Sequence, residues 1–204
     1  MTLITSLFIG FSIAAIPGPI FFELVRRTLA RGLLSGVLLA IGEFIGNFLL
    51  LSAIFFGVSN YLTNQFSKII LSLAGAAILL WLGITALRLK MSAIEKSYKK
   101  ELTDKNSVFV GFGIAVTSPI VIALWISLSK SYLEQFGSHT LAFTNIFLVA
   151  LGFLLFFIPL AGVISYTRRR ISPHNVVILS KVFGLILITY GSYFLYQFAL
   201  LLRR

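Results

Sequence analysis

Six long runs of apolar residues constrain what this chain can fold into more than any other feature. A helix needs about 20 apolar residues to cross about 30 Å of hydrocarbon, and it satisfies its own backbone hydrogen bonds in lipid. Each run is long enough: Leu3–Phe22, Leu33–Val58, Ile69–Leu89, Val108–Leu128, Leu141–Tyr166 and Val176–Leu202. We therefore predict an all-α integral membrane protein with six transmembrane helices, forming one membrane domain over residues 1–204.

The basic residues are distributed unevenly over the connections between these runs. Of the 17 Lys and Arg residues, twelve lie in or beside the first, third and fifth connections. Four lie on the other side: Lys68, Lys130, Arg203 and Arg204. Because cytoplasmic loops are enriched in Lys and Arg, we predict a multi-pass protein of the inner or plasma membrane with both termini outside. Glu23 is spaced to pair with Arg26 or Arg27 at the cytoplasmic mouth, either as a weak interfacial ion pair or as a functional one.

The same patterns argue against several functional classes. The net charge is +11, but short loops between spans account for the basic residues, so we expect no nucleic-acid partner. The absence of cysteine excludes disulfides, thiolate metal sites and thiol redox chemistry. No HExxH or GxSxG motif occurs, and neither histidine lies inside a span. We predict that the chain is not an enzyme and has no cofactor and no metal site.

Two parts of the sequence resemble each other. Residues 8–15 (FIGFSIAA) and 109–116 (FVGFGIAV) are identical at five of eight positions, and proline follows in both copies. A weaker likeness joins Ala40-Ile41-Gly42 to Ala150-Leu151-Gly152. A polar, cytoplasmic linker at 90–107 separates repeat 1, about 1–89, from repeat 2, about 108–204. Since three spans per repeat give opposite orientations, we predict two inverted three-helix repeats, as in many secondary transporters. Chance similarity between apolar segments is the alternative.

Prolines interrupt corresponding spans of the two repeats. Proline removes a helical hydrogen bond and clashes with the preceding turn. In the first span Pro17 and Pro19 do this on either side of Gly18, and in the fourth span Pro119 does it directly after Ser118. The backbone groups released in this way must face protein or a wet cavity, and the helix N-terminus after each break attracts a carboxylate. We predict that these residues line a substrate site, although Ser118 is also placed to repair the backbone. A packing kink without a ligand is the alternative.

Glu43 is the one acidic residue within the second run, about 15 Å along a helix that starts at Leu33. A carboxyl group near the membrane midplane costs on the order of 3 kcal/mol and is by default a functional-site candidate. Asn47 lies about one turn further on the same helical face. We predict that Glu43 carries a proton or binds an amine, with a structural carboxyl bonded to Asn47 as the alternative. Trp125, in the fourth span, is interpreted equally as a cavity wall and as packing.

These features resemble the LysE/RhtB-type amino-acid exporter superfamily over essentially the whole chain. The likeness rests on Pro17-Gly18-Pro19 with basic residues and Gly32 after it, Gly42-Glu43, Trp81-Leu82-Gly83, and a polar linker before a proline-bearing fourth span. Two departures occur. The family often has Asn-Pro-Lys where this chain has Ser118-Pro119-Ile120, and commonly Asp where it has Glu43. Without that lysine the site lacks a cationic contact, and the identity of the substrate stays open.

The resemblance implies a secondary transporter that exports amino acids or related small metabolites, driven by a proton or cation gradient. The partners it implies are an amino-acid substrate and the lipid bilayer. A homo-oligomer is allowed, and neither the substrate nor the coupling ion is identified. The alternatives are an inorganic-ion or metal exporter of the same superfamily, an intramembrane enzyme and an accessory membrane protein. The candidate substrate- or ion-binding residues are Pro17, Gly18, Pro19, Glu43, Asn47, Ser118, Pro119 and Trp125.

Overall fold

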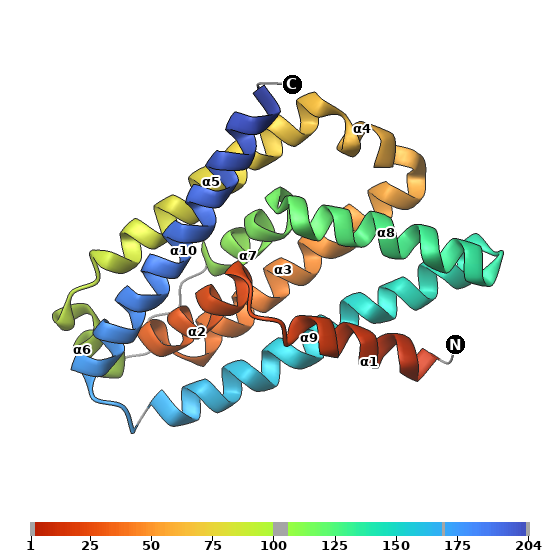
Figure 1. The fold of residues 1–204 in the computed structure, drawn as a ribbon. Coiled ribbons are helices and arrows are strands. Elements are labelled where there is room, and N and C mark those ends of the chain that lie inside the picture. The colour runs from red at the N-terminus through yellow and green to blue at the C-terminus, as the bar shows by residue number, and fades with distance from the viewer. Residues whose placement is uncertain (1–2, 100–105, 169, 203–204) are drawn as a thin grey trace.

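The regular structure of the chain is helical throughout the residues that the computed structural model describes, which are 3–99, 106–168 and 170–202. Figure 1 shows the helices in chain order. Their bounds are α1 Leu3–Ala14, α2 Pro19–Arg31, α3 Leu33–Ala53, η1 Ile54–Val58, α4 Ser59–Thr63, α5 Gln65–Leu87, α6 Met91–Lys99, α7 Asn106–Thr117, α8 Pro119–Phe136, α9 His139–Arg168 and α10 Pro173–Leu202. The prediction of an all-α chain is confirmed for this part of the sequence.

The described helices include between four and six candidate membrane spans. Four are single segments long and apolar enough to cross a membrane: 33–58, 65–87, 139–168 and 173–202. The other two are bent pairs, α1 with α2 at 73° and α7 with α8 at 64°, and each counts as one span only if the pair crosses together. The breaks lie at the predicted prolines. The first predicted run is too short, however, because α2 continues beyond Phe22 to Arg31.

Proline begins the second helix of each bent pair. Pro19 and Pro119 both occupy the first turn, where the N–H that proline lacks would have no helical acceptor. Gly18 caps α2 through extended backbone without a side-chain bond, whereas the Ser118 hydroxyl accepts a hydrogen bond from the Val121 N–H at 3.4 Å. Each proline therefore stops one helix and starts the next in a new direction.

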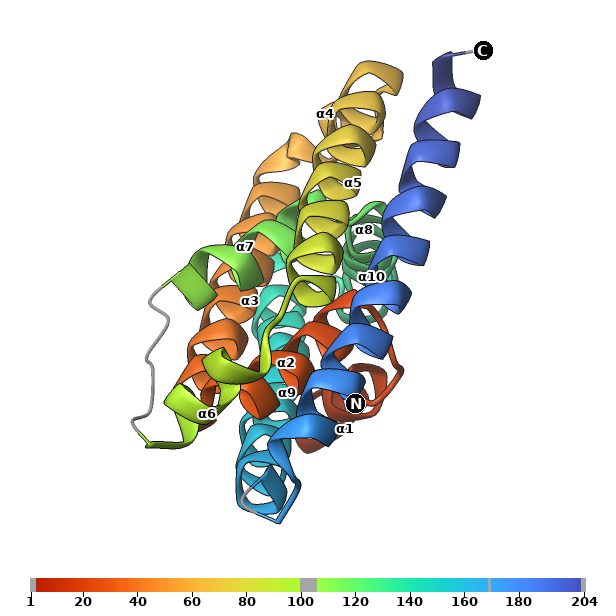
Figure 2. The same cartoon turned by 90° about the vertical axis from the view of Figure 1, so that its left-hand side faces the viewer.

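The helices cross between the two halves of the sequence. Helix α1 packs against α9, α7 packs against α3, and α5 runs alongside α10 (Figures 1 and 2). Glycines permit the first two contacts. A methyl group on Gly10 would lie 1.9 Å from the Val149 carbonyl oxygen, and one on Gly111 would lie 2.1 Å from the Leu39 carbonyl oxygen. Each contact therefore brings two helix backbones together without an intervening side chain.

The connections that carry the basic residues gather at one end of the molecule. Arg31 ends α2, Arg88 follows α5, and Arg168 and Arg170 flank the α9–α10 connection, all at the lower left of Figure 1. We call this the basic end. Both chain ends, α4 and the α8–α9 turn lie away from it, at the top and right. The predicted linker 90–107 contains α6, and residues 100–105 within it lie outside the described residues, as do Arg169, Arg203 and Arg204, which the charge count included.

The outer surface of the helices is apolar. Large side chains such as Phe8, Phe56, Trp81 and Phe109 remain between 59% and 87% exposed. Apolar surface on this scale is unusual in a soluble monomer and is typical of contact with lipid or protein. The interior also holds polar groups, and these define the candidate site.

Candidate functional site

Three side chains predicted from the sequence lie together in the protein interior. The Trp125 indole N–H donates a hydrogen bond to the Asn47 side-chain oxygen at 3.0 Å, and the Asn47 amide N–H donates to Glu43 Oε1. All three are at most 3% exposed. The second carboxyl oxygen of Glu43, Oε2, has no hydrogen-bond partner among the described residues. We call this group the Glu43 cluster. The cluster thus contains a buried carboxyl group, one oxygen of which can accept a hydrogen bond from a ligand or a proton.

Helical spacing and small residues build the Glu43 cluster. Glu43 and Asn47 are four residues apart in α3 and so share one face. Gly42 and Gly46 allow α7 to approach that helix: a methyl group on Gly42 would lie 2.0 Å from the Val108 carbonyl oxygen. These glycines are close-packing positions. Helix α8, the second helix of the α7–α8 pair, supplies Trp125, which does not line the cavity described below and whose hydrogen bond to Asn47 neither the cavity-wall nor the packing interpretation specified.

Two polar residues on the buried face of α8 were not predicted as site residues. Ser129 and Tyr132 follow Trp125 by four and seven residues, which places the three on one helical face. Both are buried, and neither hydroxyl has a hydrogen-bond partner within the described part of the chain. In the sequence, their spacing of four and seven residues from Trp125 could have identified them. These hydroxyls extend the polar character of the interior along α8, away from the Pro119 break.

The two proline breaks have different surroundings. Ser118 is buried and its hydroxyl caps the Val121 N–H, and the Thr117 hydroxyl beside it donates to the Gly113 carbonyl at 2.6 Å. At the first break, Pro17 is exposed and its carbonyl accepts a hydrogen bond from the Tyr190 hydroxyl at 3.3 Å. No hydrogen bond links Pro17, Gly18 or Pro19 to the Glu43 cluster in the described residues. The structure joins the second break to the cluster through α8, and leaves the first apart from it.

A buried ion-pair group occupies the basic end. Glu23 accepts hydrogen bonds from Arg26 at 2.6 and 2.8 Å and from Arg27 at 2.5 Å. Arg27 also donates to the Ser107 hydroxyl of α7 at 2.9 Å. The predicted pairing is confirmed, but the interfacial exposure is wrong: the ion-paired residues are at most 4% exposed. We call these four residues the Glu23 group. The ion pairs lie within α2, and the Arg27–Ser107 hydrogen bond links them to α7. Breaking a buried pair strands a charge, so loss of Glu23 would be costly.

A second contact at the basic end holds the linker helix. Arg168, at the end of α9, donates to the Ser97 hydroxyl of α6 at 2.8 Å. Ile94 of α6 is fully buried and packs in a small apolar cluster with Leu29 and Val176. The part of the linker that the structure describes is thus a helix docked on the rest of the protein.

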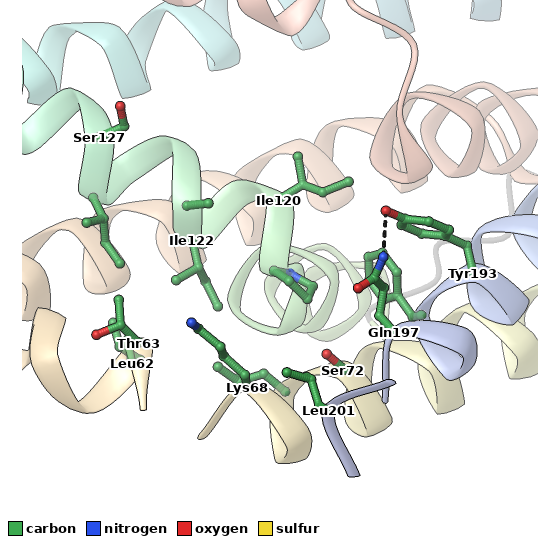
Figure 3. A pocket seen from close by; sticks show the side chains of 15 residues that line it. Leu62, Thr63, Lys68, Ser72, Ile120, Ile122, Ser127, Tyr193, Gln197 and Leu201 are labelled. Atoms are coloured by element: carbon green, nitrogen blue, oxygen red, sulfur yellow. Dashed lines mark hydrogen bonds between the residues drawn. The ribbon is translucent and has the colours of Figure 1, made fainter. Parts of the chain in front are cut away.

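A cavity of about 510 Å³ lies between α8 and the α4, α5 and α10 region. Figure 3 shows its lining, with Ile122 of α8 facing Lys68 of α5. Pro119 is the one predicted site residue that lines it. Glu43, Asn47 and Trp125 do not, since Trp125 lies on the other side of α8. Helix α8 therefore stands between the cavity and the Glu43 cluster.

Metal-ligating residues do not gather in the described ranges, where no group of three or more His, Cys, Asp and Glu is close enough to share an ion. The few acidic residues there are instead dispersed over α2, α3, α6 and α8. The polar chemistry of the site consequently rests on one carboxyl group, an amide, an indole and hydroxyls.

Comparison with known proteins identifies one matching family and two relatives. The model of the family described as LysE type translocator matches residues 11–198. "Putative amino acid efflux protein YcgF" of Bacillus subtilis is 25% identical over 200 residues, covering 93% of this chain and 92% of its own. "Chemotactic transduction protein ChpE" of Pseudomonas aeruginosa is 28% identical over 128 residues, or 63% of each chain. No solved structure matches the chain.

Proposed function

The chain belongs to the LysE type translocator family, which consists of membrane transporters and not of enzymes, and from this premise we propose its function. It is a secondary transporter that exports amino acids or related small metabolites across the cytoplasmic membrane, coupled to protons or another cation. The relative named as an amino acid efflux protein, similar over 93% of the chain, supports this substrate class. The multi-pass helical architecture provides the pathway.

The Glu43 cluster is the observation that carries the proposal. Glu43 lies about 15 Å from the start of its 26-residue span, near the midplane of a bilayer. An ionisable group at that depth is costly and usually functional. Asn47 holds one oxygen while the other remains available. In transport, Glu43 binds the substrate ammonium or carries the coupling proton, and Asn47 and Trp125 orient its carboxyl group.

The substrate carboxylate has a complementary place at the proline breaks. Helices α2 and α8 begin at Pro19 and Pro119, and a helix N-terminus attracts negative charge through its unbonded N–H groups. The second break is the stronger candidate because Ser118 is buried and the helix that begins there carries Trp125 of the Glu43 cluster. The substrate carboxylate then meets the start of α8, while its ammonium group or the coupling proton meets Glu43.

Two inverted repeats account for the way the helices cross. Gly10 in α1 and Gly111 in α7 occupy matching places in the repeated sequence, and so do Gly42 in α3 and Gly152 in α9. Gly10 packs beside Val149 of α9, while a methyl group on Gly152 would meet the Leu7 carbonyl oxygen of α1 at 2.3 Å. Gly111 and Gly42 form the corresponding contact between α7 and α3. Corresponding residues of the two halves thus make corresponding contacts, which supports six spans arranged as two inverted repeats.

Alternating access follows from the two ends of the bundle. The basic end faces the cytoplasm and both termini face outside, because Lys and Arg are retained on the cytoplasmic side. There the Arg27–Ser107 hydrogen bond of the Glu23 group joins α2 of repeat 1 to α7 of repeat 2, and we propose that this contact is the cytoplasmic gate. The cavity lies toward the opposite end, beside α4. In the transport cycle the Glu23 group separates to admit substrate from the cytoplasm.

Transport by purified protein in proteoliposomes tests the proposal. Labelled amino acids are screened with and without a pH gradient, using wild-type protein, Glu43→Gln and the exposed control Glu134→Gln. Gradient-driven flux that is lost in Glu43→Gln and retained in Glu134→Gln is the expected result. If Glu43→Gln keeps normal coupling, the role of Glu43 is wrong. If no amino acid is transported, an inorganic-ion exporter of the same superfamily becomes the better hypothesis.

A further inference from the structure

The cavity beside α8 has one charged group on an otherwise neutral wall. Lys68 is exposed and belongs to the first turn of α5. No acidic side chain lines the cavity, and no ion pair involves Lys68 within the described residues. In Figure 3 its ammonium group is directed toward α8. An uncompensated cation beside apolar walls attracts an anion such as a carboxylate and repels a second cation.

A polar pair on α10 faces the same space. The Gln197 side-chain N–H donates a hydrogen bond to the Tyr193 hydroxyl at 2.9 Å, and both residues line the cavity. This bond orients the Gln197 amide so that its oxygen is directed into the cavity (Figure 3). An amide oxygen accepts hydrogen bonds and is suited to an ammonium group. The cavity therefore offers partners for both charged groups of a zwitterion, one on α5 and one on α10.

The remaining walls favour an apolar side chain. They include Leu71, Ile120, Ile122 and Ile126, and burying apolar surface against them is favourable. The volume of about 510 Å³ lies within the roughly 300–1,000 Å³ of small-molecule sites. A lysine-like substrate would bring a second positive charge to Lys68 without any acidic partner there.

Resting on the proposed export function, we infer that this cavity is an outer binding site for amino acids with a large apolar side chain, with Lys68 as the carboxylate ligand. Gln197 accepts from the substrate ammonium, and the isoleucines of α8 contact its side chain. The site is separate from the Glu43 cluster, because Ala123 and Ile126 of α8 line the cavity while Trp125 faces the other way. Substrate that has passed Glu43 occupies this site before it leaves the outer end.

Direct binding to the purified full-length protein tests the inference. Isothermal titration with L-leucine and L-phenylalanine compares wild-type protein, Lys68→Gln, Lys68→Arg and Lys130→Gln, an exposed lysine outside the cavity. Because a hydrogen bond to a charged group contributes about a tenfold or larger change in affinity, Lys68→Gln is expected to weaken binding at least tenfold. Lys68→Arg restores most of the affinity, and Lys130→Gln leaves it unchanged. Equal affinity in wild type and Lys68→Gln overturns the inference.

Ligand variants separate an amino-acid site from a lipid-filled crevice. 4-Methylpentanoate, which lacks the amino group, and 3-methylbutylamine, which lacks the carboxylate, are each expected to bind at least tenfold more weakly than L-leucine, and L-lysine is not expected to bind. Octanoate that binds as tightly as L-leucine and displaces it identifies a site for acyl chains and overturns the inference.

The binding test is independent of transport. If proteoliposomes export L-lysine through a Glu43-dependent route while L-leucine does not bind, the export function stands and this inference is wrong. If no amino acid is transported but L-leucine binds in a Lys68-dependent manner, the site stands and the proposed export is wrong.

Discussion

Both bent helix pairs are broken at a proline, but the two breaks have different surroundings. Proline starts the second helix of each pair, at bends of 73° and 64°. The first break is exposed at Pro17 and leads into α2, which carries the Glu23 group at the basic end. The second break is buried at Ser118 and leads into α8, which has the cavity on one side and the Trp125–Asn47 hydrogen bond on the other. One pair carries buried ion pairs at the basic end, and the other contributes Trp125 to the polar interior.

The two bent pairs make similar backbone contacts but differ in their side chains. Gly10 of α1 packs against α9, and Gly111 of α7 packs against α3 in the same way. The side chains after each break differ: acidic and basic residues follow Pro19, whereas aliphatic and aromatic residues follow Pro119. The two pairs therefore share a proline break, and the side chains that follow it decide which contacts each second helix makes.

The largest expected effect comes from breaking the ion pairs of the first bent pair. Glu23→Gln leaves Arg26 and Arg27 buried without their carboxylate, which costs about 3–5 kcal/mol for a buried pair. Thermal unfolding in detergent should show a large fall in Tm, and the exposed Glu95→Gln should show none. Equal Tm values for the two variants would mean that the Glu23 group does not hold α2.

The glycine contacts test whether the two halves are equivalent. Gly10→Ala and Gly111→Ala each force a methyl group onto a carbonyl oxygen about 2 Å away, so the helices must separate at a cost of about 1–3 kcal/mol. Gly162→Ala is the control, because a methyl group there meets nothing within 4 Å. Alanine is also the better helix former, so this control should keep or raise the Tm. A fall at Gly111 alone would contradict equivalent contacts.

A change at Trp125 tests the polar role of the second bent pair. Trp125→Phe keeps an aromatic ring but leaves the Asn47 oxygen without its donor, with an expected loss of about 1 kcal/mol in stability. Transport should fall further than the Tm, because Glu43 loses its orientation through Asn47. Trp81→Phe on the lipid-facing surface is the matched control for both measurements. Normal coupled transport in Trp125→Phe would exclude a role for this hydrogen bond.

The smallest expected effect compares the two caps directly. Ser118→Ala removes the hydroxyl that accepts from the Val121 N–H, at a cost of about 0.5–1 kcal/mol since the bond is long. Gly18→Ala removes no side-chain bond and meets no neighbour, and its φ of −132° suits any residue, so the change should stay within about 0.5 kcal/mol. Denaturation of both variants under identical conditions measures the difference. A larger loss at Gly18 would reverse the comparison.

Predictions about single segments of the sequence agreed best with the structure. The second apolar run, Leu33–Val58, coincides with a candidate span, and both breaks fall at the predicted prolines. At Gly57 the backbone adopts φ 88°, which glycine tolerates, at the end of that span. The extent of α2 was wrong because Glu23, Arg26 and Arg27 ended the apolar run. Their charges are paired inside the protein, and apolarity alone cannot anticipate this.

The sequence by itself indicated the long apolar helices, the two proline breaks, and that Glu43 and Asn47 share one helical face, because spacing along one helix decides which side chains lie together. It also carried the family resemblance that the LysE type translocator match confirmed. Only the tertiary structure decided that Trp125 reaches Asn47 from 78 residues away, that Arg27 reaches Ser107, and that Lys68 faces α8 across a cavity. These contacts depend on how separate helices cross, and in this chain backbone contacts at glycines define the crossings.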